Sequence, residues 1–320
     1  GLGDNLVPIT VNPDNAFTMF IQHNSTYADN FYKDENGVYQ WGGASPDTLT
    51  GLKLMYQAYA EGLLYPDFYA LQNEQDEEMF YISATAASVY MNGTATGMQV
   101  NMMTRFNGST GLDSREVVHA VPILGEDGNF HQQDLINYWG TIVFSPNIED
   151  AKFERFMDAL DYGCTEEGFL LQVAGFEGED YDYDEDGNMI SLLPEGTALE
   201  GSEGKYPSIG GYMIANLKLW DDFMLDSPVV DQHWRDVSGA GYDNKIKYGT
   251  PETFTATDWD CWTYDSPARR QASFTYADEY INLVTNSGSE EELEANWQAW
   301  IDSKMGIIQP VLDELNAMNG

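Results

Sequence analysis

Apolar residues recur at helical spacing early in the chain. Leu49, Leu52, Tyr56, Tyr59 and Leu63 are three or four positions apart, which places them on one face of an α-helix. A Ser-Pro pair at 45–46 and a Tyr-Pro-Asp run at 65–67 are typical of the start and the stop of such a helix. The pattern therefore predicts a helix over residues 46–64.

Short apolar runs bounded by turn residues predict strands between the helices. They lie at 86–91, 117–124 and 139–144, and the Glu-Asp-Gly-Asn sequence at 126–129 predicts a hairpin-type turn between the last two. A helix is expected over 97–105. Alternating helices and strands of this kind predict the α/β class.

The remaining helical patterns lie in the second half. After the Ser-Pro-Asn turn at 145–147, Phe153, Phe156, Met157 and Leu160 predict the buried face of a helix. An apolar helix over 166–174 should end at a capping glycine. Ser289 and Glu292 fit a capping box that opens a helix with Trp297 and Trp300, and a second, closing helix is expected over 307–318. Residues 176–250, rich in Gly, Asp and Tyr, predict a loop-rich insertion with one helix near 213–225.

Composition narrows the class of protein. The chain has 320 residues and 42% apolar residues, enough for two domains or one large two-lobed unit. Its net charge of −39 would repel nucleic acids and anionic lipids, so we expect neither as a partner. Such acidity serves solubility in a salty, exposed setting, with capture of cations as the alternative.

Two further features bear on where the protein works. Cys164 and Cys261 can form one disulfide or remain two buried thiols, and the sequence leaves both open. The sequence has no apolar stretch long enough to span a membrane. It also has no signal peptide and no initiator Met, so we expect that an N-terminal portion has been removed or is not represented.

The acidic run at 182–188 is the sharpest metal candidate. Asp182, Asp184, Asp186 and Asn188 alternate, with Gly187 at the sixth place, as at the start of a calcium loop. The twelfth place holds Leu193 where that loop needs a bidentate Glu. The sequence therefore leaves two hypotheses, a calcium site and a solvated acidic turn.

Catalytic motifs are missing from the sequence, whereas aromatic residues are plentiful. The chain has no Gly-x-Ser-x-Gly elbow and no zinc-like spacing of its His residues. Its 8 Trp, 20 Tyr and 15 Phe suit a site that stacks rings on the apolar faces of sugars, although each ring alone can equally be a packing residue. Trp220, Trp234, Trp259 and Trp262, in or near the loop-rich region, together predict an aromatic-lined cleft.

Several stretches resemble family 1 extracellular solute-binding proteins, in particular the carbohydrate-binding lipoproteins of Firmicutes. Residues 36–68 combine a turn, a helix and an aromatic–x–Glu–Gly–Leu run, and residues 86–91 resemble the strand that follows in the family. Residues 156–187 contain a Gly-x-Glu-Gly-x-x-Tyr run and an acidic turn, and residues 276–306 resemble the family's closing helices. The family's lipobox cysteine and first βαβ unit have no counterpart, so the chain resembles only the later part of the family's length.

This resemblance implies a fold and a role. It implies a two-lobed, periplasmic-binding-protein type II fold with lobes discontinuous in sequence, the chain covering mainly the second lobe and part of the first. The role it implies is capture of a sugar or oligosaccharide between the lobes for the permease subunits of an ABC importer. It also implies a monomer without enzymatic activity, outside the cell, lipid-anchored through an N-terminal part that this chain lacks. The alternative is a glycoside hydrolase or another carbohydrate-active surface protein.

Five residues are predicted to contact the ligand. Asn92 follows the strand at 86–91, Tyr138 and Trp139 begin the strand at 139–144, and Trp234 and Arg235 lie in the loop-rich region. For Trp139 the alternative is a core aromatic, and for Arg235 a salt bridge with neighbouring acids. Buried sugar hydroxyls need hydrogen-bond partners, which Asn and Arg supply, while the rings stack.

Overall fold

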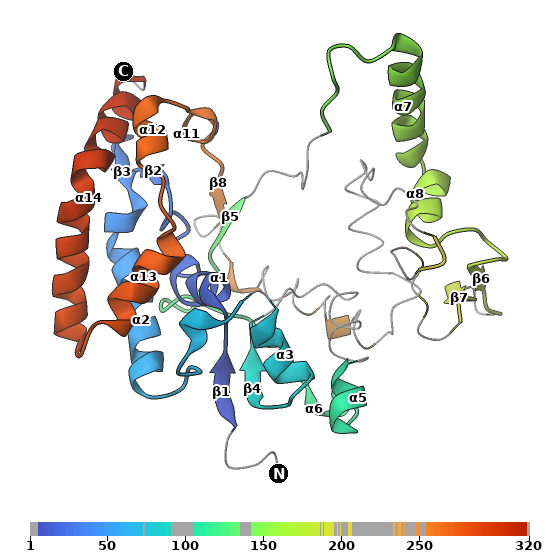
Figure 1. Ribbon diagram of the computed structural model, residues 1–320, viewed down its shortest axis with the longest axis horizontal. Helices are drawn as coiled ribbons and strands as arrows, with labels where there is room; N and C mark the ends of the chain where they lie inside the picture. Colours follow the sequence, from blue (N-terminus) through green and yellow to red (C-terminus); the bar gives the residue numbers. More distant parts are fainter. Residues whose placement is uncertain are drawn as a thin grey trace. The chain divides into compact units, whose positions relative to one another are not determined.

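A computed structural model gives the fold of the chain (Figure 1). It describes residues 6–72, 74–90, 105–134, 142–185, 187, 189–194, 197, 199, 204–206, 233, 236, 237, 240, 243, 247–249 and 254–318. The chain forms two compact units: unit 1 comprises Gly1–Gly93, Val100–Ile136 and Gly241–Gly320, and unit 2 comprises Thr94–Gln99 and Asn137–Ala240.

Unit 1 is an α/β unit with three two-stranded ladders. β1 (Val7–Thr10) pairs in parallel with β4 (Ala86–Val89), and β5 (Gln132–Asp134) pairs in parallel with β8 (Phe254–Ala256). β2 (Phe31–Lys33) and β3 (Tyr39–Trp41) form an antiparallel hairpin. The strand expected at 86–91 is therefore present as β4, although of its residues Ala86 is buried while Ala87 and Ser88 are exposed.

Helices and helical turns surround these strands in unit 1. The longer ones are α2 (Pro46–Ala60), α13 (Tyr276–Thr285) and α14 (Glu290–Met318). The shorter ones are α1 (Pro13–Ala16), the π-helical η1 (Phe17–Gln22), η2 (Gly42–Ala44), η3 (Phe68–Ala70), α3 (Gln75–Tyr81), α5 (Asn107–Thr110), α6 (Ser114–Val117), α11 (Trp259–Thr263) and α12 (Pro267–Gln271).

The predicted helix at 46–64 is confirmed as α2. Ser45 caps it by accepting from the backbone N–H of Asp47 at 3.2 Å, and Pro46 occupies its first turn. Gly51 lets α2 approach η1 closely, because a Cβ atom at this position would lie 2.6 Å from the carbonyl oxygen of Phe20.

The core of unit 1 lies where α14 packs against α2, α13 and β3. Trp41 of β3 and Trp300 of α14 are 3% and 7% exposed, with ring centroids 4.9 Å apart. Tyr280 of α13 is fully buried and donates a hydrogen bond to the carbonyl oxygen of Ala28 at 2.6 Å. Large aromatic rings of this kind remove much apolar surface from water, which stabilises the unit.

The C-terminal region is one helix, so the prediction of two closing helices was wrong. α14 runs through Gly306 and Pro310 without a break, although proline removes a backbone hydrogen bond and costs about 3 kcal/mol in a helix interior. Its buried stripe continues past the proline, from Leu293 and Trp297 to Val311 and Leu315, and this packing offsets the cost. Ser289 caps the helix, accepting from the N–H of Glu292 at 3.2 Å.

The strand expected at 117–124 is also absent. Asp113 accepts a hydrogen bond from the N–H of Arg115 at 3.0 Å and starts α6, and residues 118–125 are irregular. Val121 is 73% exposed, so the apolar run at 117–124 is not a core strand. A turn is present at 126–129, with the N–H of Gly128 donating to Gly125 at 2.9 Å, but it does not join the two strands of the expected hairpin.

The described part of unit 2 includes two helices and a hairpin. α7 (Asp150–Gly163) and α8 (Glu166–Val173) are followed by the antiparallel strands β6 (Tyr181–Tyr183) and β7 (Met189–Ser191). Asp180, which is 1% exposed, lies between α8 and β6. Its carboxylate accepts hydrogen bonds from the N–H of Phe176 at 2.8 Å, from Tyr206 and from Lys205. Gly175 ends α8 at φ +87°, as its sequence position predicts.

The predicted burial of one face of α7 was wrong. Phe153 and Met157 are 39% and 38% exposed, and Phe156 and Leu160 are half-buried. The stripe packs against Phe144, whose ring centroid lies 5.0 Å from Phe153 and 5.1 Å from Phe156, and one ring covers only part of it. Residues 142–144, the described end of the expected strand at 139–144, are irregular. Of the helix expected at 97–105 only Arg105 is described, and the helix expected at 213–225 lies outside the described residues.

The buried carboxylate of Asp76 ties the β1–α1 connection to α3. It is fully buried and accepts from the backbone N–H and the side-chain amide of Asn12 at 2.8 and 3.1 Å and from the amide of Asn15 at 2.8 Å. Three donors satisfy this buried acid, so the connection after β1 is held in one position.

We predict that Asp76→Asn lowers the free energy of unfolding by about 2 kcal/mol, because an NH₂ group then faces donors inside the protein. Urea denaturation measures this, and Asp302→Asn, at an exposed position on α14, is the matched control. Equal stability of the two variants would contradict a structural role for Asp76.

Candidate functional site

Aromatic rings gather around the turn 23–30 of unit 1, which contacts residues next to both parallel strand pairs. In open α/β folds, ligands bind beyond the carboxyl ends of the strands. β4 is followed there by Tyr90 and β8 by Asp258 and α11, and the turn 23–30 links the two strand pairs. We call this region the strand-end surface; it comprises His23, Thr26, Tyr27, Tyr90, Phe130, Thr255, Asp258, Trp259 and Trp262.

His23 lies between two aromatic rings at the end of β4. Its ring centroid is 6.1 Å from that of Tyr90 and 5.8 Å from that of Phe130. Burial lowers the pKa of His23 to about 4; a hydrogen bond with the backbone of His131 opposes this shift in part, and the charge of His131 adds to it. The imidazole is therefore neutral near pH 7, and its buried Nδ1 atom has no hydrogen-bond partner among the residues that the structure describes.

Residues around His23 are fixed by their own hydrogen bonds. The N–H of Phe130 donates to the carbonyl oxygen of Tyr248 at 2.8 Å, and His131 Nε2 lies 2.9 Å from Asp127 Oδ2. Asn24 donates to the carbonyl oxygen of Phe20 at 2.9 Å and accepts from the N–H of Glu126 at 2.8 Å. This part of the surface is thus prearranged.

Tyr27 and Thr26 connect this cluster to β8. The hydroxyls of Thr26 and Thr255 are 3.2 Å apart, and Tyr27 stacks on Tyr32 with ring centroids 5.5 Å apart. Burial raises the pKa of Tyr27, with the charges of Asp258 and Cys261 as smaller contributions in the same direction. The phenol of Tyr27 therefore lies close to the start of α11.

Asp258 is the central acid of the surface and is already fully engaged. It caps α11 by accepting from the N–H groups of Asp260 and Cys261 at 3.1 and 3.2 Å, and it accepts from the hydroxyl of Tyr39 at 2.8 Å. Burial alone would raise the pKa of Asp258, but these hydrogen bonds and the charge of Lys33, 3.4 Å away, lower it. An ionised carboxylate held in this way positions a helix and does not act as a general acid.

α11 turns two indole rings toward solvent. Trp259 and Trp262 are 55% and 47% exposed, whereas Cys261 between them is 2% exposed and lies with its Sγ 3.8 Å from Asn30 Oδ1. Arg269 donates to the same Asn30 oxygen at 2.9 Å. α11 therefore offers two rings for stacking on a ligand.

The residues predicted from the sequence to contact the ligand lie outside the described residues. This holds for Asn92, Tyr138, Trp139, Trp234 and Arg235, and also for Asp186 and Asn188 of the acidic run. Of the residues of the strand-end surface, the sequence indicated Trp259 and Trp262 as members of an aromatic group. It missed His23 and Tyr27, whose positions depend on contacts far along the chain.

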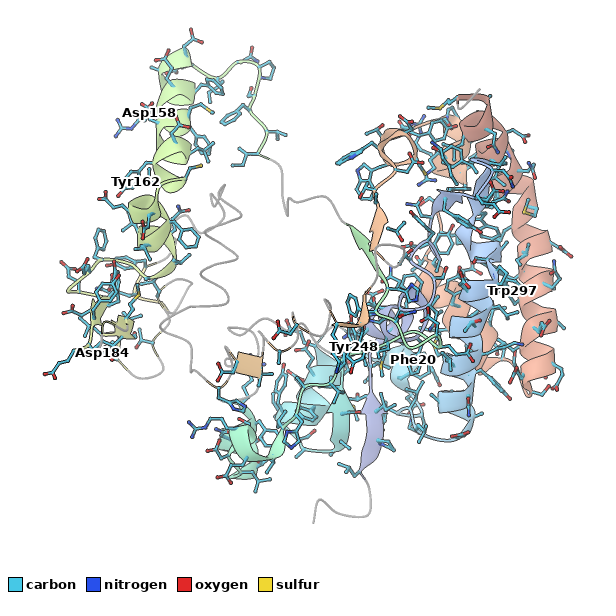
Figure 2. All side chains as sticks on the ribbon, turned by 180° about the vertical axis from the view of Figure 1, so that it is seen from behind. Phe20, Asp158, Tyr162, Asp184, Tyr248 and Trp297 are labelled. Atoms are coloured by element: carbon cyan, nitrogen blue, oxygen red, sulfur yellow. The ribbon has the colours of Figure 1, made fainter. Side chains whose placement is uncertain are left out.

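The acidic run forms the turn between β6 and β7. Asp182 is paired with Ile190 in the hairpin and its Oδ1 accepts from the N–H of Tyr183 at 2.8 Å, while the carbonyl oxygen of Asp184 (Figure 2) accepts from Gly187. In the part of the chain that the structure describes, no group of three His, Cys, Asp or Glu side chains could hold a metal ion. Leu193 at the twelfth place also departs from a calcium loop, so calcium stays a prediction. Cys261 and Cys164 are both thiols, buried and half-buried respectively.

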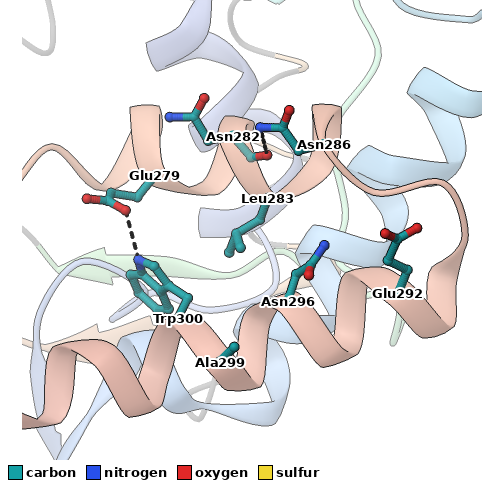
Figure 3. A pocket seen from close by; sticks show the side chains of 8 residues that line it. All are labelled: Glu279, Asn282, Leu283, Asn286, Glu292, Asn296, Ala299 and Trp300. Atoms are coloured by element: carbon teal, nitrogen blue, oxygen red, sulfur yellow. Dashed lines mark hydrogen bonds between the residues drawn. The ribbon is translucent and has the colours of Figure 1, made fainter.

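A groove of about 510 Å³ lies between α13 and α14 (Figure 3). Its polar groups largely bond to each other: Glu279 accepts from Trp300 and Lys304 at 3.0 and 2.6 Å, and Glu292 accepts from the N–H of Gly288 at 2.8 Å. The groove is therefore a seam between two packed helices and a weaker candidate than the strand-end surface. Among the described residues, no helix is both long and apolar enough to cross a bilayer.

Comparison with known proteins shows the fold. No family model and no curated protein matches the chain. Among solved structures, the alginate-binding protein AlgQ2, determined without calcium ion, superposes with a TM-score of 0.52 at 17% identity, covering 98% of this chain and 64% of that chain. An HMO-binding, ABC-transporter-associated solute-binding protein from Bifidobacterium longum infantis superposes with a TM-score of 0.50 at 13% identity, covering 99% of this chain and 65% of that chain.

These superpositions cover nearly all of this chain, which spans a little under two thirds of the length of each solved protein. The chain therefore has the α/β fold of periplasmic-binding-protein-type solute-binding proteins, and the predicted fold class is confirmed.

We predict that His23 makes the protein sensitive to acid. Its pKa is about 4 when folded and about 6.5 when unfolded, so the unfolded state takes up a proton first as the pH falls. The stability present above pH 6.5 is lost between pH 6.5 and about 4, by about 2–3 kcal/mol at pH 4.5. Urea denaturation at pH 7 and pH 4.5 should show a smaller loss for His23→Phe than for the unchanged protein.

His119→Gln, at an exposed position, is the control for this experiment and should follow the unchanged protein. Identical losses of stability in His23→Phe and the unchanged protein would mean that His23 titrates normally.

Proposed function

We propose that the chain captures a sugar or oligosaccharide as the substrate-binding component of an ABC importer and performs no chemistry on it. The observation that carries the proposal is the fold likeness over 98% and 99% of the chain to two solved proteins, one described as alginate-binding and the other as HMO-binding and ABC-transporter-associated. The likeness is one of fold at low identity, and the chemistry of the strand-end surface supplies the second line of support.

The strand-end surface suits binding better than catalysis. Its exposed indoles and its hydroxyl and amide groups match the two faces of a sugar ring, one apolar and one polar. The acids Asp76, Asp180 and Asp258 are engaged by several donors each, which fixes the backbone around them. Acids committed in this way do not serve as proton donors in glycoside hydrolysis.

The proposal includes the residues and the setting expected from the sequence. Asn92, Tyr138, Trp139, Trp234 and Arg235 contribute ligand contacts, and a second lobe closes on the ligand because the ligand touches both lobes. The protein works outside the cell, lipid-anchored through a preceding segment, and delivers its ligand to permease subunits. Calcium at Asp182, Asp184, Asp186 and Asn188 would support the fold of the hairpin region.

We predict that a neutral or acidic oligosaccharide raises the melting temperature of the protein. A ligand that binds only the folded state stabilises it by about 2.7 kcal/mol at about 100 times its Kd, which corresponds to several degrees. Differential scanning fluorimetry against glycans, peptides and calcium tests this, with aryl glycosides added to detect hydrolysis. A shift by peptides alone, or turnover of an aryl glycoside, would contradict capture of sugars without chemistry.

We also predict that Trp139→Ala weakens binding of the glycan found in that screen at least about tenfold, because a stacking ring is lost. Isothermal titration calorimetry measures the affinity. Tyr162→Ala, which removes an exposed ring from α7 (Figure 2), is the control and should bind as the unchanged protein does. Unchanged affinity in Trp139→Ala would remove Trp139 from the site.

A further inference from the structure

The turn between β2 and β3 places an asparagine directly before a glycine. Asn36 is exposed in this turn, and Gly37 follows it at φ +75°, in the left-handed region that residues with a Cβ atom rarely adopt. Asn-Gly is a favoured pair in tight hairpin turns for this reason. The need for a glycine at position 37 therefore also sets the chemistry of the residue before it.

The reaction open to this pair is an attack by the glycine nitrogen on the asparagine side chain. The backbone nitrogen of Gly37 forms a bond with Cγ of Asn36, and the bond from Cγ to the amide nitrogen breaks. The amide group leaves as ammonia with the proton of the Gly37 N–H, and a cyclic succinimide remains. One water molecule then opens the ring at either carbonyl group and gives aspartate or isoaspartate. The sum of the steps replaces NH₂ with OH and needs no oxidant or cofactor.

The side chain of Asn36 can turn toward Gly37. The backbone N–H of Asn36 donates to Oδ1 of Asp34 at 2.9 Å, but no residue in the described ranges bonds to its side-chain amide group. The N–H of Gly37 donates to the carbonyl oxygen of Asp34 at 2.9 Å. Because this bond lies in an exposed turn, local opening makes the nitrogen available while the rest of the protein stays folded.

Another Asn-Gly pair in the described residues lacks this freedom. Asn107 begins α5, and its side-chain oxygen accepts a hydrogen bond at 2.9 Å from the N–H of the buried Ser114. Its carbonyl oxygen accepts from the N–H of Gly111 at 3.0 Å. The two bonds resist the rotation that would bring Gly108 onto Cγ of Asn107. The protein therefore contains one dipeptide in a free and in a held environment.

Either product of the reaction at Asn36 disturbs a turn that Asp34 organises. Oδ1 of Asp34 accepts from the N–H groups of Asn36 and Val38, both at 2.9 Å, and Oδ2 accepts from the amide of Gln40 at 3.0 Å. Aspartate at position 36 adds a negative charge beside Asp34 and Glu35. Isoaspartate adds a carbon atom to the backbone between the two N–H donors, so both can no longer reach the same oxygen.

This turn supports the strand-end surface through the strands that it connects. Lys33 and Tyr39 pair across β2 and β3 on either side of the turn, and they contact Asp258 at 3.4 and 2.8 Å. Asp258 in turn caps α11. A looser turn therefore weakens the support of α11.

We propose that Asn36 is a site of spontaneous deamidation, where ring closure with Gly37 yields aspartate and isoaspartate and loosens the hairpin of β2 and β3. The modification needs no enzyme and accumulates with the age of the protein. It acts from outside the strand-end surface and does not depend on the proposed function.

Trypsin separates the two Asn-Gly pairs, because it cuts after Lys and Arg. Residues 34–53 and 106–115 form one peptide each, and each peptide contains a single asparagine. The 320-residue chain is incubated at neutral pH in heavy-oxygen water, digested in ordinary water and analysed by liquid chromatography with mass spectrometry. We expect aspartate and isoaspartate at position 36, each with one heavy oxygen atom. The reaction should be at least about fivefold faster at Asn36 than at Asn107, because the bonds that hold Asn107 must open first.

Asn36→Gln is the matched control, because its longer side chain closes a ring far more slowly while the turn keeps an amide. Its peptide should stay unmodified over the same time. Hydrogen exchange then measures the consequence for the hairpin: the amides of residues 31–41 should exchange at least about threefold faster in the aged protein than in equally aged Asn36→Gln.

Each other outcome overturns a defined part of the proposal. Equal rates at Asn36 and Asn107, or no reaction at Asn36, would refute the site. Aspartate without isoaspartate would mean direct hydrolysis of the amide and refute ring closure with Gly37. If both products form while the hairpin exchanges as in aged Asn36→Gln, the loosening of the hairpin is refuted. The proposed function stands in all of these cases, because it is tested by binding of glycans.

Discussion

Asp258 accepts hydrogen bonds from two backbone N–H groups of α11 and from Tyr39, and it lies 3.4 Å from Lys33. This one carboxylate joins the end of β8 to the β2–β3 hairpin, and through the hairpin to α14, where Asn316 accepts from the N–H of Tyr39 at 2.8 Å. The direction of α11, and with it the direction of both exposed indoles, depends on these contacts. Without them the helix of five residues would have little reason to form, since isolated helices of that length are unstable in water.

Basic residues are scarce in this protein. The chain has 53 acidic and 14 basic residues. Near the strand ends, Lys33 pairs with Asp258, Arg270 pairs with Asp265, and Arg269 lies over the ring of Phe31. The buried acid Asp76 is satisfied by backbone and amide donors, whereas Asp180 accepts from a backbone N–H, from Tyr206 and from Lys205. A surface built in this way can bind a ligand by stacking on its exposed rings.

Local chemistry explains what the sequence predicted well. Ser45, Thr165 and Ser289 lie at the starts of α2, α8 and α14, and Gly175 ends α8, so caps and helical spacing located these helices. The sequence pattern was misleading before residue 307, where it predicted a break but the packing of one stripe continues through Gly306 and Pro310, and at 117–124, where Asp113 starts a short helix in place of a strand. Both errors come from tertiary contacts and capping that a periodic pattern does not contain.

The candidate site was harder to predict than the fold. The aromatic content indicated ring stacking, and Trp259 and Trp262 belonged to the group of tryptophans that the sequence marked. The role of each depends on Cys261 being buried against residues 30 and 31, a contact across some 230 positions. His23 and Tyr27 carry no local motif, because their surroundings come from β4, β5 and β8 folding onto one turn.

Native mass spectrometry of the protein mixed with a neutral oligosaccharide tests the central claim most directly, because it weighs the complex and the bound glycan together. Capture without chemistry predicts one intact glycan per chain, still of its original mass after prolonged incubation. A protein that carries no glycan, or one that releases shortened sugars, would contradict the account.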